Sequence, residues 1–194
     1  MAKVIIDLGC GGRKKPGSVG MDVASIPGVD VVANMAYGLP FRDNSVDAIY
    51  VYHVLEHMDN FLDTMGEIWR VCRDGARAYV KVPHAASPFM TWKDPTHRRG
   101  LTIATFAYFD DTYFDGAAFA YYSPAKFRIE KAKLNFTLTD RQVDPQLSLM
   151  RKIINPMFDA VANKSRGWQY ACERFWGPVV GIEEAVLTLR ALKA

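Results

Sequence analysis

The chain has 194 residues, of which 49% are hydrophobic and 23% charged, and its formal net charge is +3. This size and composition are typical of one soluble globular domain, and they exclude disordered, coiled-coil and collagen-like classes. The three cysteines, Cys10, Cys72 and Cys172, are far apart and odd in number, which predicts free thiols in a reducing compartment. No stretch reaches the roughly 20 apolar residues of a membrane span, and no signal-like region precedes the first strand, so we expect a cytoplasmic protein.

Short apolar runs bounded by turn residues predict strands in the first part of the chain. Four such strands are expected, at residues 4–8, 18–23, 29–33 and 46–52. Apolar residues at helical spacing from Phe61 predict a helix, with Asp59 or Asn60 as its N-cap and Asp74-Gly75 as its end. Residues 76–82 then form a fifth predicted strand.

The second half of the chain continues the same pattern after an irregular segment. Residues of about 84–126 hold eight aromatic side chains between Phe106 and Tyr122 and are interpreted as an insertion or lid. A sixth strand is expected over 127–138, helices broken near Pro156 and Gly167 over 144–175, and a last strand over 184–192.

This order of elements predicts an α/β fold with a Rossmann-like, mostly parallel seven-stranded sheet flanked by helices. No linker or repeat interrupts the sequence, so residues 1–194 are expected to form one domain. Its core would be residues 3–83, and residues 127–194 would add the C-terminal strands and helices. Ligands of such sheets bind beyond the carboxyl ends of the strands, which directs attention to the residues that follow each strand.

The first strand ends in a glycine-rich turn, since residues 4–12 read V-I-I-D-L-G-C-G-G. Gly9 and Gly11 can adopt positive φ and let a ligand approach the backbone, and Asp7 can accept hydrogen bonds from an ammonium group. Pro16-Gly17 leaves little room for a helix before the next strand, which ends at Asp22. A dinucleotide is disfavoured, because its pyrophosphate would lack the helix N-terminus that normally holds it.

Three further motifs follow in order: N-M-A-Y-G-L-P-F-R-D-N-S-V-D-A-I at residues 34–49, Y-H-V-L-E-H at 52–57 and R-V-C-R-D-G at 70–75. Together with residues 4–12 they resemble the class I S-adenosylmethionine-dependent methyltransferases, in particular a compact type 11-like subgroup with a shortened first crossover. The resemblance covers about two fifths of the chain. It departs at Asn34, where the family often has Asp, and at Asp74, where a proline is usual.

The resemblance implies S-adenosylmethionine as cofactor and a direct in-line methyl transfer. It implies that Asp7, Gly9 and Gly11 hold the methionine part, Asp22 the ribose hydroxyls, Asn34 and Met35 the adenine edge, and Tyr52 and His53 the sulfonium side. With the crossover helix shortened, the cations of residues 13–15 could replace its dipole at the cofactor carboxylate. No metal ligand set follows from the resemblance.

The acceptor is expected to be a small molecule, a sugar or a lipid-linked compound. If its nucleophile needs a base, His97 is the first candidate and His84 the second, with Asp94 beside His97 in one turn. The same residues could merely close a loop, since proximity alone drives many methyl transfers. Nucleic acid is disfavoured, because the chain has neither an Asn- or Asp-Pro-Pro-Tyr amine site nor a separate basic module.

Two other functions stay open from the sequence. One is a binding or activating module that keeps the S-adenosylmethionine-binding fold but does not catalyse methyl transfer. The departures from the family pattern support this alternative. The other is a zinc peptidase, since His53, Glu56 and His57 match H-x-x-E-H. That reading is less favoured, because the motif follows a strand and lacks a long helix. A homodimer also stays open.

Overall fold

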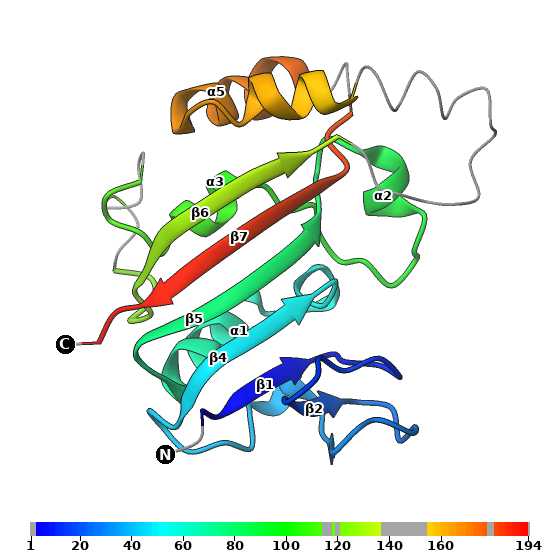
Figure 1. Ribbon diagram of the computed structural model, residues 1–194, viewed down its shortest axis with the longest axis vertical. Coiled ribbons are helices and arrows are strands. Elements are labelled where there is room, and N and C mark those ends of the chain that lie inside the picture. Colours follow the sequence, from blue (N-terminus) through cyan, green and yellow to red (C-terminus); the bar gives the residue numbers. More distant parts are fainter. Residues whose placement is uncertain (1–2, 114–117, 119–120, 137–154, 178–180, 194) are drawn as a thin grey trace.

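The computed structural model describes residues 3–113, 118, 121–136, 155–177 and 181–193. They form a seven-stranded sheet with the order β3-β2-β1-β4-β5-β7-β6 (Figure 1). Strands β1 to β5 run parallel, and β7 is antiparallel to both of its neighbours. This confirms the predicted Rossmann-like, mostly parallel architecture.

The strands follow the predicted apolar runs closely in the centre of the sheet and less closely at its edges. Their bounds are β1 Ile5–Leu8, β2 Val19–Asp22, β3 Val31–Val32, β4 Val46–Tyr52, β5 Cys72–Pro83, β6 Phe127–Asn135 and β7 Glu184–Ala191. Strand β4 has the predicted bounds. Its core-facing residues Val46, Ile49 and Val51 are fully buried, which is why its apolar run was a clear signal. The 29–33 strand shrinks to two residues at the edge of the sheet.

Helix α1 (Phe61–Val71) links β4 to β5. The side chain of Asn60 caps it by accepting the backbone N–H of Asp63, as predicted. The predicted end at Asp74-Gly75 is wrong, because the Cys72 N–H already closes the helix and β5 begins there. Gly75, with a φ of +75°, instead lies within β5, where the register with β4 shifts.

Helices α1 and α3 (Ile103–Ala107) lie on one face of the sheet (Figure 1). Among the described residues no helix covers the opposite face, where Tyr50 stacks on Tyr79 with ring centroids 5.0 Å apart. The segment 9–18 between β1 and β2 contains no helix, so the shortened first crossover is confirmed. The N-terminal third of the sheet is therefore thinly covered.

The aromatic-rich segment contains α2 (Pro88–Trp92) and α3, and part of it belongs to the core. Phe106 and Phe109 are buried and pack against Phe61 of α1, with ring centroids 5.7 and 5.9 Å away. Tyr121 and Tyr122 are exposed. Phe114 and Phe119 lie outside the described residues, so a lid over the acceptor stays a prediction.

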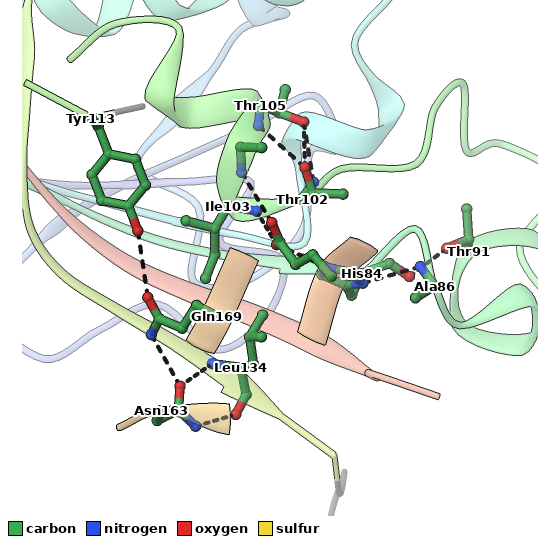
Figure 2. Close-up of polar contacts among 12 residues, drawn as sticks. His84, Ala86, Thr91, Thr102, Ile103, Thr105, Tyr113, Leu134, Asn163 and Gln169 are labelled. Carbon is green, nitrogen blue, oxygen red and sulfur yellow. Dashed lines mark hydrogen bonds and ion pairs between the residues drawn. The ribbon is translucent and has the colours of Figure 1, made fainter. Parts of the chain in front are cut away.

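The C-terminal helices cover the outer edge of β6. They comprise a helix over 155–162, α5 (Arg166–Ala171) and a π-helical turn, η4 (Cys172–Trp176); the predicted helix over 144–154 lies outside the described residues. Asn163 exchanges two hydrogen bonds with the backbone of Leu134 (Figure 2). Gln169 donates to the Ala132 carbonyl. In the part of the chain that the structure describes, no helix has the length and apolar character of a membrane span.

Candidate functional site

A cavity of about 400 Å³ opens at the carboxyl ends of β1, β2 and β4, where ligands of such sheets bind. Its volume lies within the range of small-molecule sites. The cavity is lined by Gly9, Met21, Asp22, Val23, Ala33, Asn34, Met35, Ala36, His53, Val54, His57, Met58 and Asp59. Five of the eight residues expected to bind a cofactor are among them: Gly9, Asp22, Asn34, Met35 and His53.

Gly9 lets the turns after β1 and β4 approach each other. Its φ is +63°, and a Cβ at this position would lie 2.3 Å from Cγ2 of Val54. Its N–H donates to the Met21 carbonyl at 2.8 Å, which continues the pairing of β1 with β2 past the end of the strand. The turn therefore stays close to the sheet and forms one wall of the cavity.

Asp22 ends β2, and its carboxylate is held by two backbone donors. Its Oδ2 accepts the N–H of Gly11 at 2.8 Å, and its Oδ1 accepts the N–H of Ala24 at 2.9 Å. Each carboxylate oxygen can accept more than one hydrogen bond, so both remain able to bind a hydroxyl of a ligand. Gly11 does not line the cavity, and its contribution is to orient Asp22.

Asn34 and Met35 stand where the chain leaves β3. The Oδ1 of Asn34 accepts the N–H of Ala36 at 2.9 Å and so caps the short helix η1 (Met35–Tyr37). The side-chain amide is exposed at the cavity, while Met35 is buried. With Met21 and Met58 it supplies apolar wall suited to a flat aromatic ring.

His53 follows β4 in the left-handed region, with a φ of +56°. Its Nε2 lies 3.1 Å from Oε1 of Glu184, and its Nδ1 lies 3.5 Å from Oε1 of Glu56. Contacts with Glu184 and then Glu56 raise the pKa of His53 to about 9, against the opposing effect of burial. Burial would raise the pKa of Glu184, but His53, Lys81 and Asn135 together lower it. The cavity is thus lined by an imidazolium between two buried carboxylates.

Asp7 and Tyr52 lie outside the cavity lining. Asp7 is buried and accepts the N–H of Lys15 at 2.7 Å, and burial raises its pKa in spite of this bond. The Nζ of Lys15 lies 4.8 Å from the ring centre of Tyr52, and that of Lys81 lies 5.1 Å from it on the sheet. In this structure Asp7 fixes the segment after the glycine turn, and its contact with a ligand stays a prediction.

Next to the cavity, His57 brings His97 and Asp94 into one group. The rings of His57 and His97 meet edge to face, with centroids 4.7 Å apart. The Nδ1 of His97 donates to the Thr91 carbonyl at 2.7 Å, while the Nδ1 of His57 lies 2.9 Å from the hydroxyl of Thr96. That hydroxyl donates to Asp94 at 2.7 Å. His57 lines the cavity, so this pair of histidines borders it.

His84 lies elsewhere and is buried (Figure 2). Its Nδ1 accepts the N–H of Ala86 at 3.0 Å, and its Nε2 lies 2.9 Å from Oε1 of Glu173. Because Nδ1 accepts, Nε2 carries the proton and donates to Glu173. Both ring nitrogens are engaged within the protein, and this geometry favours His97 over His84 as a base.

The H-x-x-E-H residues do not form a peptidase-like helix. His53 precedes the short helix η2 (Leu55–His57), and its two nitrogens face carboxylates. Glu56, His57 and Glu184 belong to the site but were not predicted as binding residues. Glu56 and His57 lie within a motif recognised from the sequence, but Glu184 comes from β7, where nothing in the local sequence points to the cavity.

Part of the chain matches a known protein family. The family described as "Methyltransferase domain" matches residues 13–80, about a third of the chain, and this range includes Asp22, Asn34 and His53. No curated protein matches the chain by sequence.

Solved structures share the fold across nearly the whole chain. The YcgJ protein from Bacillus subtilis is 13% identical, with a TM-score of 0.59 over 99% of this chain and 92% of its own. A SAM-dependent methyltransferase from Archaeoglobus fulgidus is 15% identical, with a TM-score of 0.53 over 97% and 86%. A chain from the complex of the Haloferax volcanii Trm112 methyltransferase activator with a protein assigned as a methyltransferase is 15% identical, with a TM-score of 0.56 over 98% and 83%. At these identities the likeness establishes the fold.

Proposed function

We propose that this chain, which has the class I methyltransferase fold and matches the methyltransferase domain family over residues 13–80, binds S-adenosylmethionine in the cavity beyond β1, β2 and β4 and transfers its methyl group to a small acceptor. The acceptor would be a small molecule, a sugar or a lipid-linked compound. The observation that carries the proposal is Asp22, a carboxylate held in place by Gly11 and Ala24 at the cavity wall.

The residues present fit the nucleoside half of this cofactor. Asp22 can accept both hydroxyls of a ribose, because each of its oxygens keeps a free lone pair. The methionines of the wall would contact the adenine ring, and the amide of Asn34 would meet its polar edge. A cofactor bound here would supply a methyl group on a sulfonium, whose sulfur is the leaving group when the acceptor attacks the methyl carbon in line. The protein's part is to align the acceptor and to exclude water.

The pKa of His53 limits the part that this residue can take in the reaction. The buried carboxylates of Glu184 and then Glu56 raise it to about 9, and Lys81 is a second cation beside Glu184. His53 itself is protonated at neutral pH and so cannot accept a proton from the acceptor.

We assign to His97 the role of the base that takes the acceptor's proton. Its Nδ1 hydrogen is held by the Thr91 carbonyl, so the lone pair of the neutral ring is on Nε2. It stands beside His57 at the border of the cavity. A histidine in this tautomer can take the proton of a hydroxyl or an amine as the methyl group is transferred.

Calorimetric titration with S-adenosylhomocysteine tests the binding half of the proposal. Asp22→Asn should weaken binding about 10- to 100-fold, since a hydrogen bond to a charged group contributes about 1.5–3 kcal/mol. Asp47→Asn is the matched control, because Asp47 also accepts a backbone N–H, from Val4, but at the start of β4. Equal affinity for the wild type and Asp22→Asn would refute the assignment of this cavity.

Turnover tests the enzymatic half. Incubation with S-adenosylmethionine and acceptors of the three classes should yield a methylated product, which mass spectrometry detects. Tight cofactor binding without a product from any of them would favour the alternative of a non-catalytic module with this fold.

A further inference from the structure

Glu56, His57 and His97 bring three groups that can ligate a metal to one place. One ligand atom from each lies within 4.8 Å of the other two. Glu56 and His57 belong to η2, directly after β4, whereas His97 belongs to the loop after α2. The cluster therefore joins two segments that are far apart in the sequence, and the H-x-x-E-H spacing does not define it.

The environment of Glu56 is a second, independent indication of a bound cation. Its side chain is 1% exposed, and among the described residues neither carboxylate oxygen has a hydrogen-bond partner. His53 is a charged neighbour, with its Nδ1 3.5 Å from Oε1. A buried carboxylate without hydrogen bonds is costly, so a cation at this position would stabilise it.

The two histidines are already oriented as metal ligands are. Nδ1 of His97 donates to the Thr91 carbonyl, which leaves the lone pair on Nε2. The Thr96 hydroxyl gives its hydrogen to Asp94, so it can only accept from Nδ1 of His57, and Nε2 of His57 is again the free nitrogen. Metal-bound histidines usually donate their second N–H to a carbonyl or a carboxylate-linked group in this way.

We propose that Glu56, His57 and His97 bind a divalent transition-metal ion of the zinc class at the border of the cavity. Two imidazoles and one carboxylate are a donor set of catalytic zinc sites, which keep a further position open. Ligands of tetrahedral zinc lie ~3.3 Å apart, so the three side chains must close by about 1.5 Å at most. Because His57 also lines the cavity, the ion would lie at its border.

The role of the ion rests on the proposed function, although its binding does not. A hydroxyl or thiol of the acceptor that coordinates such an ion loses its proton to water near neutral pH. When the ion is bound, the lone pair of His97 is a metal ligand, and the ion takes over from His97 the task of making the acceptor lose its proton. The oxygen or sulfur anion attacks the methyl carbon, and the carbon–sulfur bond of the sulfonium breaks.

The test uses the full chain after removal of metals with a chelator and dialysis. Titration with Zn²⁺ alone should show one ion per chain, and Co²⁺ should give the visible absorption of a tetrahedral site. His97→Gln and Glu56→Gln should each weaken Zn²⁺ binding at least ~10-fold and remove the Co²⁺ spectrum. His53→Gln is the matched control: it should bind Zn²⁺ at least as tightly as the wild type and keep the Co²⁺ spectrum, since His53 is not a ligand in this geometry and its removal takes a competing cation away from Glu56.

Three results would overturn the proposal: no 1:1 binding by the wild type, wild-type affinity in His97→Gln, or a loss in His53→Gln as large as in His97→Gln. The last result would assign the ion to the H-x-x-E-H residues. Circular dichroism of each variant separates lost ligation from lost folding, and His97, which is partly exposed, is the safer substitution. Titration of the same samples with S-adenosylhomocysteine reports on the proposed function separately.

Discussion

The backbone of Gly9 has a φ of +63°, and a Cβ there would lie 2.3 Å from Val54 Cγ2. Gly11, two residues later, has a φ of +51° but open space around the same position. An alanine at Gly11 would therefore cause backbone strain alone, whereas an alanine at Gly9 would cause both backbone strain and steric overlap. Both effects act at a turn that forms or supports the cavity, so they bear on stability and on ligand binding together.

We expect Gly11→Ala to lower the free energy of unfolding by about 1 kcal/mol, through its positive φ alone. Gly9→Ala should lower it by about 2–4 kcal/mol, because the overlap with Val54 adds to the same strain. Urea unfolding followed by circular dichroism measures both values. Equal losses for the two variants would show that Val54 moves aside without cost.

The sequence predicted which residues after β1, β2 and β3 line the cavity, but it predicted poorly the charged groups around His53. Gly9, Asp22 and Asn34 follow strands whose carboxyl ends meet, so local signals place them together. Glu184 reaches His53 from β7, and that contact depends on the antiparallel return of the last strand. His84 was predicted as a catalytic candidate because it follows β5, but the structure gives both of its nitrogens partners inside the fold.

At the scale of elements, α1 holds the segment that precedes β4. Arg70 donates to Glu67 at 2.7 Å and to the carbonyls of Leu39 and Phe41 at 2.9 and 3.0 Å. Glu67 also accepts the N–H of Leu39 at 2.8 Å. One ion pair on the helix thus satisfies three backbone groups of an irregular segment.

The hydrogen bonds from Arg70 lower the pKa of Glu67 below its usual value of 4.5. A carboxyl whose pKa is lower in the folded state stabilises the protein above pH 4.5, and this stabilisation is lost as the pH falls through the folded-state value. Glu67→Gln should therefore reduce the free energy of unfolding by about 1 kcal/mol at pH 7, since the pair is partly exposed.

The difference between the wild type and Glu67→Gln should shrink towards zero in progressively acidic buffers. Urea unfolding of both proteins at each pH measures it. A difference that is the same at pH 7 and in strong acid would mean that packing, and not the charge of Glu67, is responsible.

The elements themselves were predictable where one physical signal dominated. Strand β4 and helix α1 begin where the apolar period and the capping residue place them. The end of α1 was predicted three residues too late, because Gly75 was taken for a helix stop and in fact permits a bend within β5. The aromatic segment showed no clear period, so α2 and α3 within it, and the burial of Phe106 and Phe109, could not be foreseen.

At the scale of the whole molecule, Glu173 connects the C-terminal helices to the end of β5. It accepts hydrogen bonds from Nε2 of His84 at 2.9 Å and from the N–H of Ile103 at 2.6 Å. The side chains of His84 and Glu173 are 1% and 8% exposed. The contact joins the end of β5, the start of α3 and the C-terminal helices, which are separate in the sequence.

Glu173→Ala should lower the free energy of unfolding by about 3 kcal/mol, because each buried donor left without a partner costs about 1–3 kcal/mol. Glu173→Gln keeps one acceptor oxygen and should lose less than half of that. Thermal and urea unfolding give the two values, and binding of S-adenosylhomocysteine should be unchanged in both variants, since Glu173 lies away from the cavity. A loss below about 0.5 kcal/mol in Glu173→Ala would contradict a structural role for this pair.

The edge strands of the sheet, β3 and β6, are both protected against pairing with another strand, but in different ways. At one border β3 is only two residues long, and at the other the amide side chains of Asn163 and Gln169 occupy backbone groups of β6. Unpaired strand borders are where a second chain adds a strand and where fibres begin, and short or covered borders prevent this. In the part of the chain that the structure describes, neither border offers a template of useful length, so we expect two copies of this protein to associate through their broad surfaces, with no continuous sheet running between them.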